Sequence, residues 1–339
     1  MSLKAAKILM SLLVIFLLNT GFASEDKQGK SPLDELPPHI KLLAPFGERA
    51  DFSHDSKRIL FLEKTFGDVY EAEIETGKIK PMTHHYYHTG YTRALYLSNG
   101  DILLSGPKRL DPDNPAEGRS EKNAELWVLN KNLSGPPTRF GENCSEGPAV
   151  SRKNIKIAWT RNNCFYMADI GYENEKPKIE NKKKIFDVNQ LPFECSLETQ
   201  NFRPPDEKEL IFTAYGYQGT EVFGLDIETG KVINYSNAPN QYDEPEGIFP
   251  DGKFTTVECD KHYPRGYQYD DIYKLALDGS GKTERLTFFA DYLGYKASNP
   301  VISDDGKYMA FQYAKLGDWA GIGRGILIFD LEAYEKQKK

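Results

Sequence analysis

The chain has 339 residues, of which 39% are hydrophobic, 27% are charged and 12% are aromatic. This composition excludes a disordered chain and a protein with many membrane spans. The formal net charge of −7 argues against nucleic acid or an anionic membrane surface as the main partner, because both repel an acidic protein.

The first 23 residues have the pattern of an export signal. Lys4 and Lys7 give a positive start, residues 8–18 are almost wholly apolar, and the small residues Gly21 and Ala23 lie two apart. The apolar run is too short to span a bilayer comfortably, so we expect cleavage after Ala23; a retained anchor is the alternative. Cleavage removes two lysines and takes the net charge from −7 to −9. The prediction is a periplasmic or secreted protein without membrane insertion.

Four cysteines follow the predicted cleavage point: Cys144, Cys164, Cys195 and Cys259. Export makes disulfides feasible, and four cysteines allow three complete pairings, between which the sequence does not choose. The first three lie in the middle of the chain, so we expect one structural disulfide there. No Cys-x-x-Cys motif points to zinc.

A repeated strand–turn–strand unit dominates the rest of the sequence. Each copy has a turn of Asp, Asn or Gly residues between two short strands, because these residues tolerate the backbone angles of tight hairpins. Six copies occur, at 51–61, 94–104, 149–159, 202–212, 247–257 and 300–311. A second hairpin follows in several units, at 69–79, 222–232 and 272–282. Four strands per repeat at this spacing predict an all-β, six-bladed β-propeller, with a solenoid of the same units as the alternative.

The two ends of the chain are predicted to close the ring together. The last unit has only three strands, at 300–302, 307–313 and 325–331, and residues 40–44 form a strand without a partner. We expect residues 40–44 to become the outer strand of the last blade, which leaves no open seam. The predicted organisation is a signal peptide at 1–23, a linker at 24–38, the propeller at 39–334 and a tail at 335–339.

These repeats resemble those of TolB-type β-propellers, a WD40-like group of exported bacterial proteins. The resemblance rests on three repeat units, at 51–62 with 69–83, 202–213 with 222–232, and 248–257 with 271–287. It implies a six-bladed propeller, but the short stretch from Ala23 to Leu42 leaves no room for the N-terminal domain of TolB. Stand-alone propellers of this type resemble binding scaffolds, and some are polysaccharide lyases.

Loop length predicts which face carries function. The first-to-second and third-to-fourth turns of a blade lie on one face and are short here. The second-to-third loops and the connections between blades lie on the other face and are long, at 83–92, 106–124, 141–147, 188–200, 260–269, 288–298 and 314–324. Long loops on a rigid scaffold are the usual place for binding residues, so we expect a ligand on this long-loop face.

The connection at 83–93 carries the densest polar cluster, with His84, His85, His88, Tyr91 and Arg93. Tyrosines can stack on sugar rings, and His and Arg can bind hydroxyl or carboxylate groups, so a carbohydrate-like ligand is one interpretation. A divalent metal is another, although no carboxylate lies inside the loop and we assign no metal ligand. The third is simple packing of the loop on the first two blades.

Residues that begin each blade form a second candidate group, because they should approach the central axis at one level. They are Arg49, Arg93, Glu146, Gln200, Asn201, Glu244, Glu246 and Asn299. Such a ring outlines either a polar ligand pocket or a water-filled channel with internal ion pairs. Two further loops add candidate ligand-binding residues, His262 and Trp319.

Two functions remain open from these residues. The first is a binding module for a carbohydrate or peptide ligand, which includes docking to another envelope protein, with candidates His84, His85, His88, Arg93, Glu146, Gln200, Glu244, His262 and Trp319. The second is a glycan-degrading enzyme, most simply a lyase, in which His88 or Tyr91 removes a proton and Arg93 neutralises a carboxylate. No nucleotide-binding or hydrolase motif occurs, and no cofactor is assigned.

Overall fold

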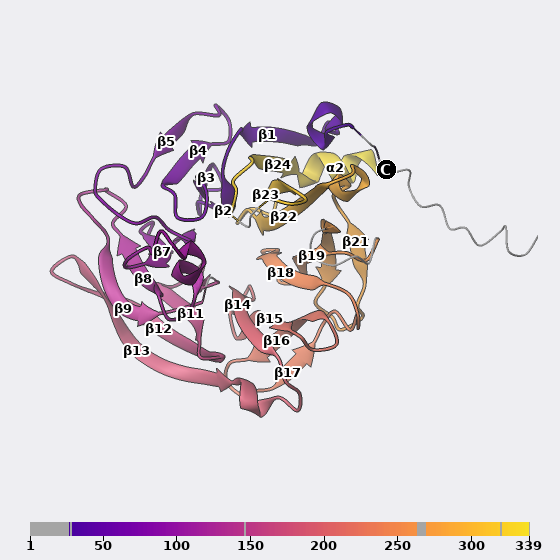
Figure 1. Ribbon diagram of the computed structural model, residues 1–339. Helices are drawn as coiled ribbons and strands as arrows, with labels where there is room; N and C mark the ends of the chain where they lie inside the picture. Colours follow the sequence, from indigo (N-terminus) through magenta and orange to yellow (C-terminus); the bar gives the residue numbers. More distant parts are fainter. Residues whose placement is uncertain (1–26, 28, 146, 263–268, 319–320, 339) are drawn as a thin grey trace, which may run out of the picture.

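The computed structural model describes residues 27, 29–145, 147–262, 269–318 and 321–338. Within them, six antiparallel sheets of four strands each stand in a ring (Figure 1). The predicted all-β, six-bladed propeller is thereby confirmed. The predicted signal peptide, residues 1–23, lies outside the described residues.

Each blade follows the same plan, with its first strand innermost and its fourth strand outermost (Figure 1). Blade 1 consists of β2 (Glu48–Phe52), β3 (Arg58–Leu62), β4 (Val69–Glu73) and β5 (Ile79–Pro81). Blade 2 consists of β6 (Arg93–Tyr96), β7 (Ile102–Pro107), β8 (Ala124–Leu129) and β9 (Thr138–Asn143). Blade 3 consists of β10 (Ala149–Val150), β11 (Lys156–Arg161), β12 (Cys164–Glu173) and β13 (Lys176–Asp187).

The other three blades repeat this arrangement. Blade 4 consists of β14 (Ser196–Phe202), β15 (Glu209–Tyr215), β16 (Thr220–Asp226) and β17 (Val232–Asn234). Blade 5 consists of β18 (Asp243–Ile248), β19 (Phe254–Cys259), β20 (Asp271–Ala276) and β21 (Thr283–Arg285). Blade 6 consists of β22 (Tyr295–Ile302), β23 (Tyr308–Lys315), β24 (Ile326–Asp330) and β1 (Ile40–Ala44).

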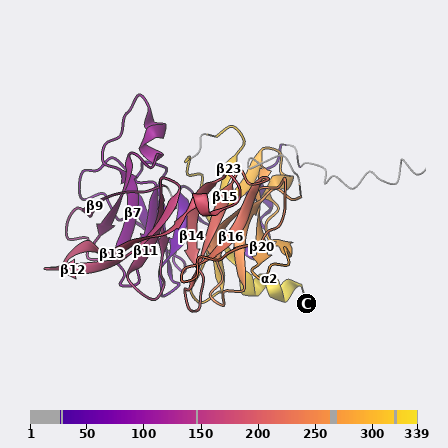
Figure 2. The same ribbon diagram turned by 90° about the horizontal axis from the view of Figure 1, so that it is seen from below.

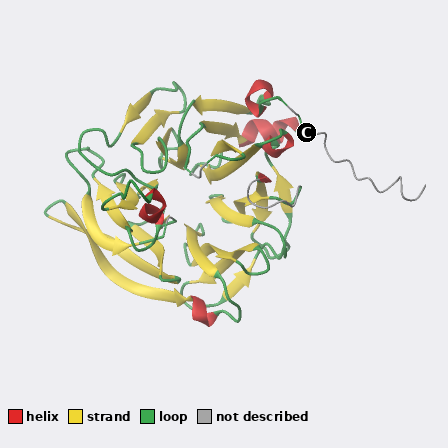
Figure 3. Ribbon diagram, in the orientation of Figure 1, coloured by secondary structure: helices red, strands yellow, loops and turns green. Residues whose placement is uncertain are grey.

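The few helices are short and lie outside the sheets (Figure 3). They are η1 (Pro32–Glu35), η2 (Pro115–Arg119), η3 (Val188–Gln190), η5 (Phe289–Asp291) and α2 (Leu331–Gln337). The last residues of α2 lie in the predicted C-terminal tail, residues 335–339. The Asp330 carboxylate caps α2 by accepting from the backbone N–H of Ala333 at 2.8 Å, which is why the chain turns helical directly after β24.

The repeated turn has a common hydrogen-bond pattern that explains its sequence. In blade 1 the Ser53 hydroxyl donates to Asp55 at 2.6 Å, and Asp55 accepts from the backbone of Lys57 at 3.1 Å. Ser303 and Asp305 of blade 6 make the same hydroxyl–carboxylate contact at 2.7 Å. Side chains that bond local backbone N–H groups stabilise a tight turn, so the repeated serine and aspartate specify the hairpin.

The chain closes the ring as predicted, by pairing its first strand with its last. β1 lies antiparallel to β24, with Ile40 opposite Phe329 and Ala44 opposite Ile326. The side chains of Ile40 and Ala44 are buried, whereas Leu42 between them is exposed. An otherwise unpaired edge of β24 is therefore covered by a strand from the other end of the chain.

Hydrophobic residues fill the spaces between neighbouring blades. Among the described residues, six buried clusters form, one at each blade-to-blade boundary. Phe61, for example, packs in the cluster shared by blades 6 and 1, and Trp159 in the cluster shared by blades 2 and 3. Because each blade buries both faces against its neighbours, stability comes from the closed circle rather than from one central core.

The long and short loops lie on opposite faces, as the topology requires. Figure 2 shows the loop that carries η2 projecting from one face and α2 lying on the other. Two predicted loops were too long, because strands β14 and β22 begin inside them, at Ser196 and Tyr295. Both strands are bulged and carry polar residues toward the ring centre, so their composition resembles that of a loop.

The expected structural disulfide is not formed. All four cysteines are free thiols, with Cys144 and Cys259 buried. Of the three cysteines expected to share the disulfide, Cys144 packs between blades 2 and 3, whereas Cys195 packs against the cluster between blades 3 and 4, so blade 3 separates these two. None of the helices among the described residues is long and apolar enough to cross a membrane.

Replacing Ile40 with aspartate tests the closure. The substitution places a carboxylate in the blade 6 core, and we expect the free energy of unfolding to fall by about 3 kcal/mol. Leu42→Asp introduces the same carboxylate at an exposed position of the same strand and should cost less than about 1 kcal/mol. Urea denaturation of both variants measures the difference, and equal losses would contradict the closing role of β1.

Candidate functional site

A channel along the ring axis widens into two chambers. The lower chamber, of about 290 Å³, opens among the short first-to-second turns. The upper chamber, of about 450 Å³, opens on the long-loop face. Arg49, Arg93 and Glu246 line both, so they form the waist between the two.

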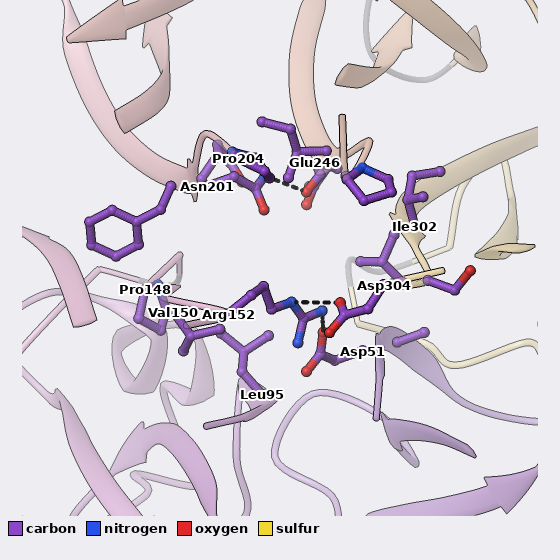
Figure 4. Close-up of a pocket in the computed structure, with 18 of the residues that line it drawn as sticks. Asp51, Leu95, Pro148, Val150, Arg152, Asn201, Pro204, Glu246, Ile302 and Asp304 are labelled. Carbon is purple, nitrogen blue, oxygen red and sulfur yellow. Dashed lines mark hydrogen bonds and ion pairs between the residues drawn. The ribbon is translucent and has the colours of Figure 1, made fainter. Parts of the chain in front are cut away.

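The lower chamber has apolar walls and one ionic network. Leu95, Val150, Phe202 and Ile302 line it together with several other apolar residues. Figure 4 shows Arg152 of blade 3 reaching across to Asp51 of blade 1 and Asp304 of blade 6. The guanidinium lies 3.0 Å from Asp51 and 3.2 Å from Asp304. Burial raises the pKa of the Asp51 carboxyl, and the positive charge of Arg152 opposes that shift. Arg152 thus compensates the buried carboxyl group.

The upper chamber is the more polar of the two, and ionisable side chains converge on it from five of the blades. It is lined by Glu48 and Arg49 from blade 1, Arg93 and Arg119 from blade 2, Glu198 and Tyr215 from blade 4, and Glu244, Glu246 and Glu258 from blade 5. Tyr242 precedes blade 5, and blade 6 contributes Lys296, Asn299 and Gln312. A concave cavity with convergent charged groups is the usual form of a ligand site.

A chain of hydroxyl and carboxyl groups lines the wall formed by blades 4 and 5. The Tyr215 hydroxyl lies 2.8 Å from Glu198 and also contacts Glu244, which bonds Tyr242 as well. The Tyr215 hydroxyl has one proton and can donate it to only one of the two carboxyl groups. The other contact is a hydrogen bond only if that carboxyl group carries a proton and donates it to the phenol oxygen. Burial, together with Glu246 and other nearby carboxylates, raises the pKa of Glu244 well above its ordinary value, which favours its protonated form.

Three carboxyl groups gather deeper on the same wall. Glu244, Glu246 and Glu258 each offer an oxygen within 4.8 Å of the others, the spacing of cation ligands. Partners within the chain compensate part of this cluster. Lys296 lies 3.8 Å from Glu258, and Arg93 lies 3.7 Å from Glu246. Asn299 donates to Glu258 at 2.7 Å and to Glu246 at 2.8 Å.

Three arginines form the opposite wall, on blades 1 and 2. Arg119 ends η2, which lies next to the central opening (Figure 3). Burial and the neighbouring charge of Arg49 lower the pKa of Arg119 to about 10. The backbone of Arg49 donates to Gln312 at 2.6 Å, which fixes this strand against blade 6.

The histidine-rich connection lies apart from both chambers. His84 and His88 flank Asp68 in a separate shallow pocket that shares no lining residue with the channel. His88 Nδ1 accepts from the backbone of Gly90 at 2.9 Å, so its Nε2–H faces Asp68 at 3.0 Å. His85 contacts the Gly135 carbonyl at 3.2 Å. These bonds tie the connection to blades 1 and 2.

Of the residues considered for the lyase, the two candidate bases lie together, because the rings of His88 and Tyr91 stack with their centroids 5.0 Å apart. Tyr91 is buried in the cluster between blades 1 and 2, and its hydroxyl lies 3.1 Å from that of Tyr86. His88 faces the side pocket, whereas Arg93 lines the channel. The structure therefore does not gather His88, Tyr91 and Arg93 around one cavity.

The remaining candidates divide between the channel and the blades. Glu244 lines the upper chamber, and Gln200 lines the lower one, where its amide donates to Thr213 at 3.2 Å. His262 stacks on Tyr273 inside blade 5, and burial, reinforced by Arg285, lowers its pKa to about 4. Glu146 and Trp319 lie outside the described residues.

Several residues of the upper chamber were not among the predicted candidates, including Arg119, Tyr215, Tyr242, Glu258 and Lys296. Tyr215 and Glu258 lie at or beside the end of the second strand in their blades, level with the blade-entry residues. Their position in the repeat could therefore have predicted them from the sequence. Nothing in the sequence could have predicted Arg119, because a long loop carries it back over the axis.

No model of a known protein family matches the sequence, and no curated protein matches it. Solved structures do match. A putative TolB from Agrobacterium tumefaciens is 16% identical with a TM-score of 0.52, over 73% of this chain and 78% of that chain. XC5397 from Xanthomonas campestris, described as a gluconolactonase, is 8% identical with a TM-score of 0.52, over 86% of this chain and 88% of that chain.

An oligogalacturonate lyase from Vibrio parahaemolyticus also matches, at 13% identity and a TM-score of 0.48, over 84% of this chain and 78% of that chain. Identities this low show the fold alone. The chain thus has the fold of a TolB-type six-bladed β-propeller, as its repeats predicted.

Replacing Arg152 with methionine tests the cross-ring ion pairs. The substitution leaves Asp51 buried without its cation, so we expect a loss of about 3 kcal/mol in the free energy of unfolding. Adding Asp51→Asn should restore much of that loss, because the stranded charge is then gone. Urea denaturation of both single variants and the double variant measures the coupling, and additive losses would contradict it.

Glu246 should make stability depend on pH. Burial raises its pKa from 4.5 to about 7, although Arg93 opposes the shift. Between these two values the folded state holds a proton that the unfolded state has lost, so its contribution to stability falls as the pH rises. Glu246→Gln removes this dependence.

We therefore expect the melting temperature of Glu246→Gln, relative to wild type, to increase from pH 5 to pH 8. Other titrating groups, such as His262, act in both proteins and cancel in the comparison. Scanning calorimetry at the two pH values measures the difference. A difference that is constant or decreases would show that Glu246 ionises normally.

Proposed function

We propose that the protein is an exported binding module that takes a polar ligand, carbohydrate-like or peptide, into the upper chamber. The observation that carries this proposal is the chamber itself, a cavity of about 450 Å³ lined by charged side chains from opposite sides of the ring. Export rests on the predicted signal at residues 1–23. A binding role also agrees with the fold, which presents long loops around a rigid channel.

The proposal moves the predicted site from the histidine connection to the ring axis. The side chains of the histidine connection are exposed or are bonded to their own blades, as His88 is to Asp68. In the upper chamber, by contrast, carboxyl groups stay buried close to one another at a cost in desolvation. Such costs are concentrated at functional sites, because a ligand can offset them.

A thermal-shift screen of the mature protein against sugars and short peptides tests the proposal. A ligand at one hundred times its dissociation constant should add about 2.7 kcal/mol to the free energy of unfolding. We expect Arg119→Gln to weaken that ligand at least tenfold. Arg109→Gln, an exposed arginine in the same loop, is the matched control and should bind normally.

Two results would redirect the proposal. Loss of binding in His88→Ala but not in Arg119→Gln would place the ligand in the side pocket. The alternative is a lyase on the long-loop face. It would be established if incubation with acidic glycans produced absorbance at 235 nm and if His88→Ala or Arg119→Gln abolished that absorbance.

A further inference from the structure

The two walls of the upper chamber differ in charge. Arg49, Arg93 and Arg119 come from blades 1 and 2, with the carboxylate of Glu48 3.9 Å from Arg49. Glu198, Glu244, Glu246 and Glu258 come from blades 4 and 5. In Figure 1 these two pairs of blades lie on opposite sides of the central opening. The chamber therefore has a basic wall that faces an acidic wall across the axis.

The basic wall suits an anionic group. A guanidinium presents several N–H donors in a planar fork that matches a carboxylate. Arg119 reaches the chamber with Arg49 and Arg93 close enough to lower its pKa, and Glu48 and Glu198 partly offset them. A carboxylate placed among the three arginines would reduce their mutual repulsion.

The acidic wall suits a cationic group. Glu198 is the least buried of its four carboxyls, and its partner Tyr215 lines the chamber beside it at 2.8 Å. A protonated amine has three N–H donors, which a carboxylate and the neighbouring phenol oxygens can accept. The cation of Lys296 lies further along, next to Glu258 and Asp270.

At the waist the walls approach each other, since Arg93 and Glu246 are 3.7 Å apart. Above the waist the cavity separates them. We infer that the ligand of the upper chamber is a small zwitterion that carries a carboxylate toward Arg119 and a protonated amine toward Glu198. This inference rests on the proposed function and names the chemical class of its ligand.

Neutral and singly charged ligands fit the chamber less well. A neutral sugar compensates neither wall, and an ion of one sign compensates only one of them. A cavity of about 450 Å³ is within the range for small ligands, such as a short peptide with free ends or an amino sugar that bears a carboxylate. Both sources share the same two charged groups.

Calorimetric titration with capped and uncapped ligands tests the class. Trialanine with free ends is compared with its N-acetylated form and its C-terminal amide, and muramic acid with N-acetylmuramic acid. We expect at least one uncapped ligand to bind at least tenfold more tightly than its capped forms. Which series binds distinguishes a peptide from an amino sugar.

Variants assign the two charges to the two walls. Arg119→Gln should remove the preference for the free carboxylate over the amide and keep the preference for the free amine. Glu198→Gln should do the reverse. The matched controls Arg109→Gln and Glu194→Gln, both exposed, should leave both preferences intact.

The outcomes separate the inference from the proposed function. If capped forms or neutral glucose bind as tightly as the free zwitterions and Arg119→Gln weakens them, the chamber is a binding site and the zwitterion is wrong. If no member of the panel binds, both proposals fall.

Discussion

The pairing of β1 with β24 is the contact on which the rest of the molecule depends. Five backbone positions from one end of the chain cover the open edge of the last blade. An open ring would leave the boundary between blades 6 and 1 free to separate, and the hydrophobic cluster there would be exposed. Closure sets the radius of the channel, because each inner strand is then held between two neighbours.

Because the radius is fixed, charged side chains that would move apart in a flexible scaffold are held close together. Arg152 crosses from blade 3 to carboxylates of blades 1 and 6, and Arg93 meets Glu246 from nearly the opposite side. In the upper chamber the burial of Glu244 and the carboxyl groups close to it raise its pKa well above the ordinary value. The interblade clusters supply the stability that holds these groups in place.

The matching structures share the fold of this chain at 16% identity or less. The hairpins and the interblade packing build that fold, whereas the charges around the axis belong to the inner strands and the long loops. A propeller can change its inner strands without disturbing the clusters between its blades, because the two sets point in different directions from the same sheet. The shared fold therefore leaves the binding properties to the side chains of the channel.

Much of this architecture was encoded locally. The six Asp, Asn and Gly turns, the alternating strands and the unpaired segment at 40–44 determined the fold, since each depends on neighbouring residues or on strand count. The blade-entry residues Arg49, Arg93, Glu246 and Asn299 followed from the period of the repeat. Their common place at the axis is a consequence of ring symmetry.

Only the tertiary structure decided where the charges oppose one another. Arg119 enters the chamber from a long loop whose path no local rule specifies, and Tyr215 reaches Glu244 from another blade. The histidine connection likewise owes its position to tertiary contacts, since His88 bonds Asp68 of blade 1 and His85 contacts the Gly135 carbonyl of blade 2. Residue types and spacing reveal which side chains can react; distances across the ring, set by closure, determine which of them meet.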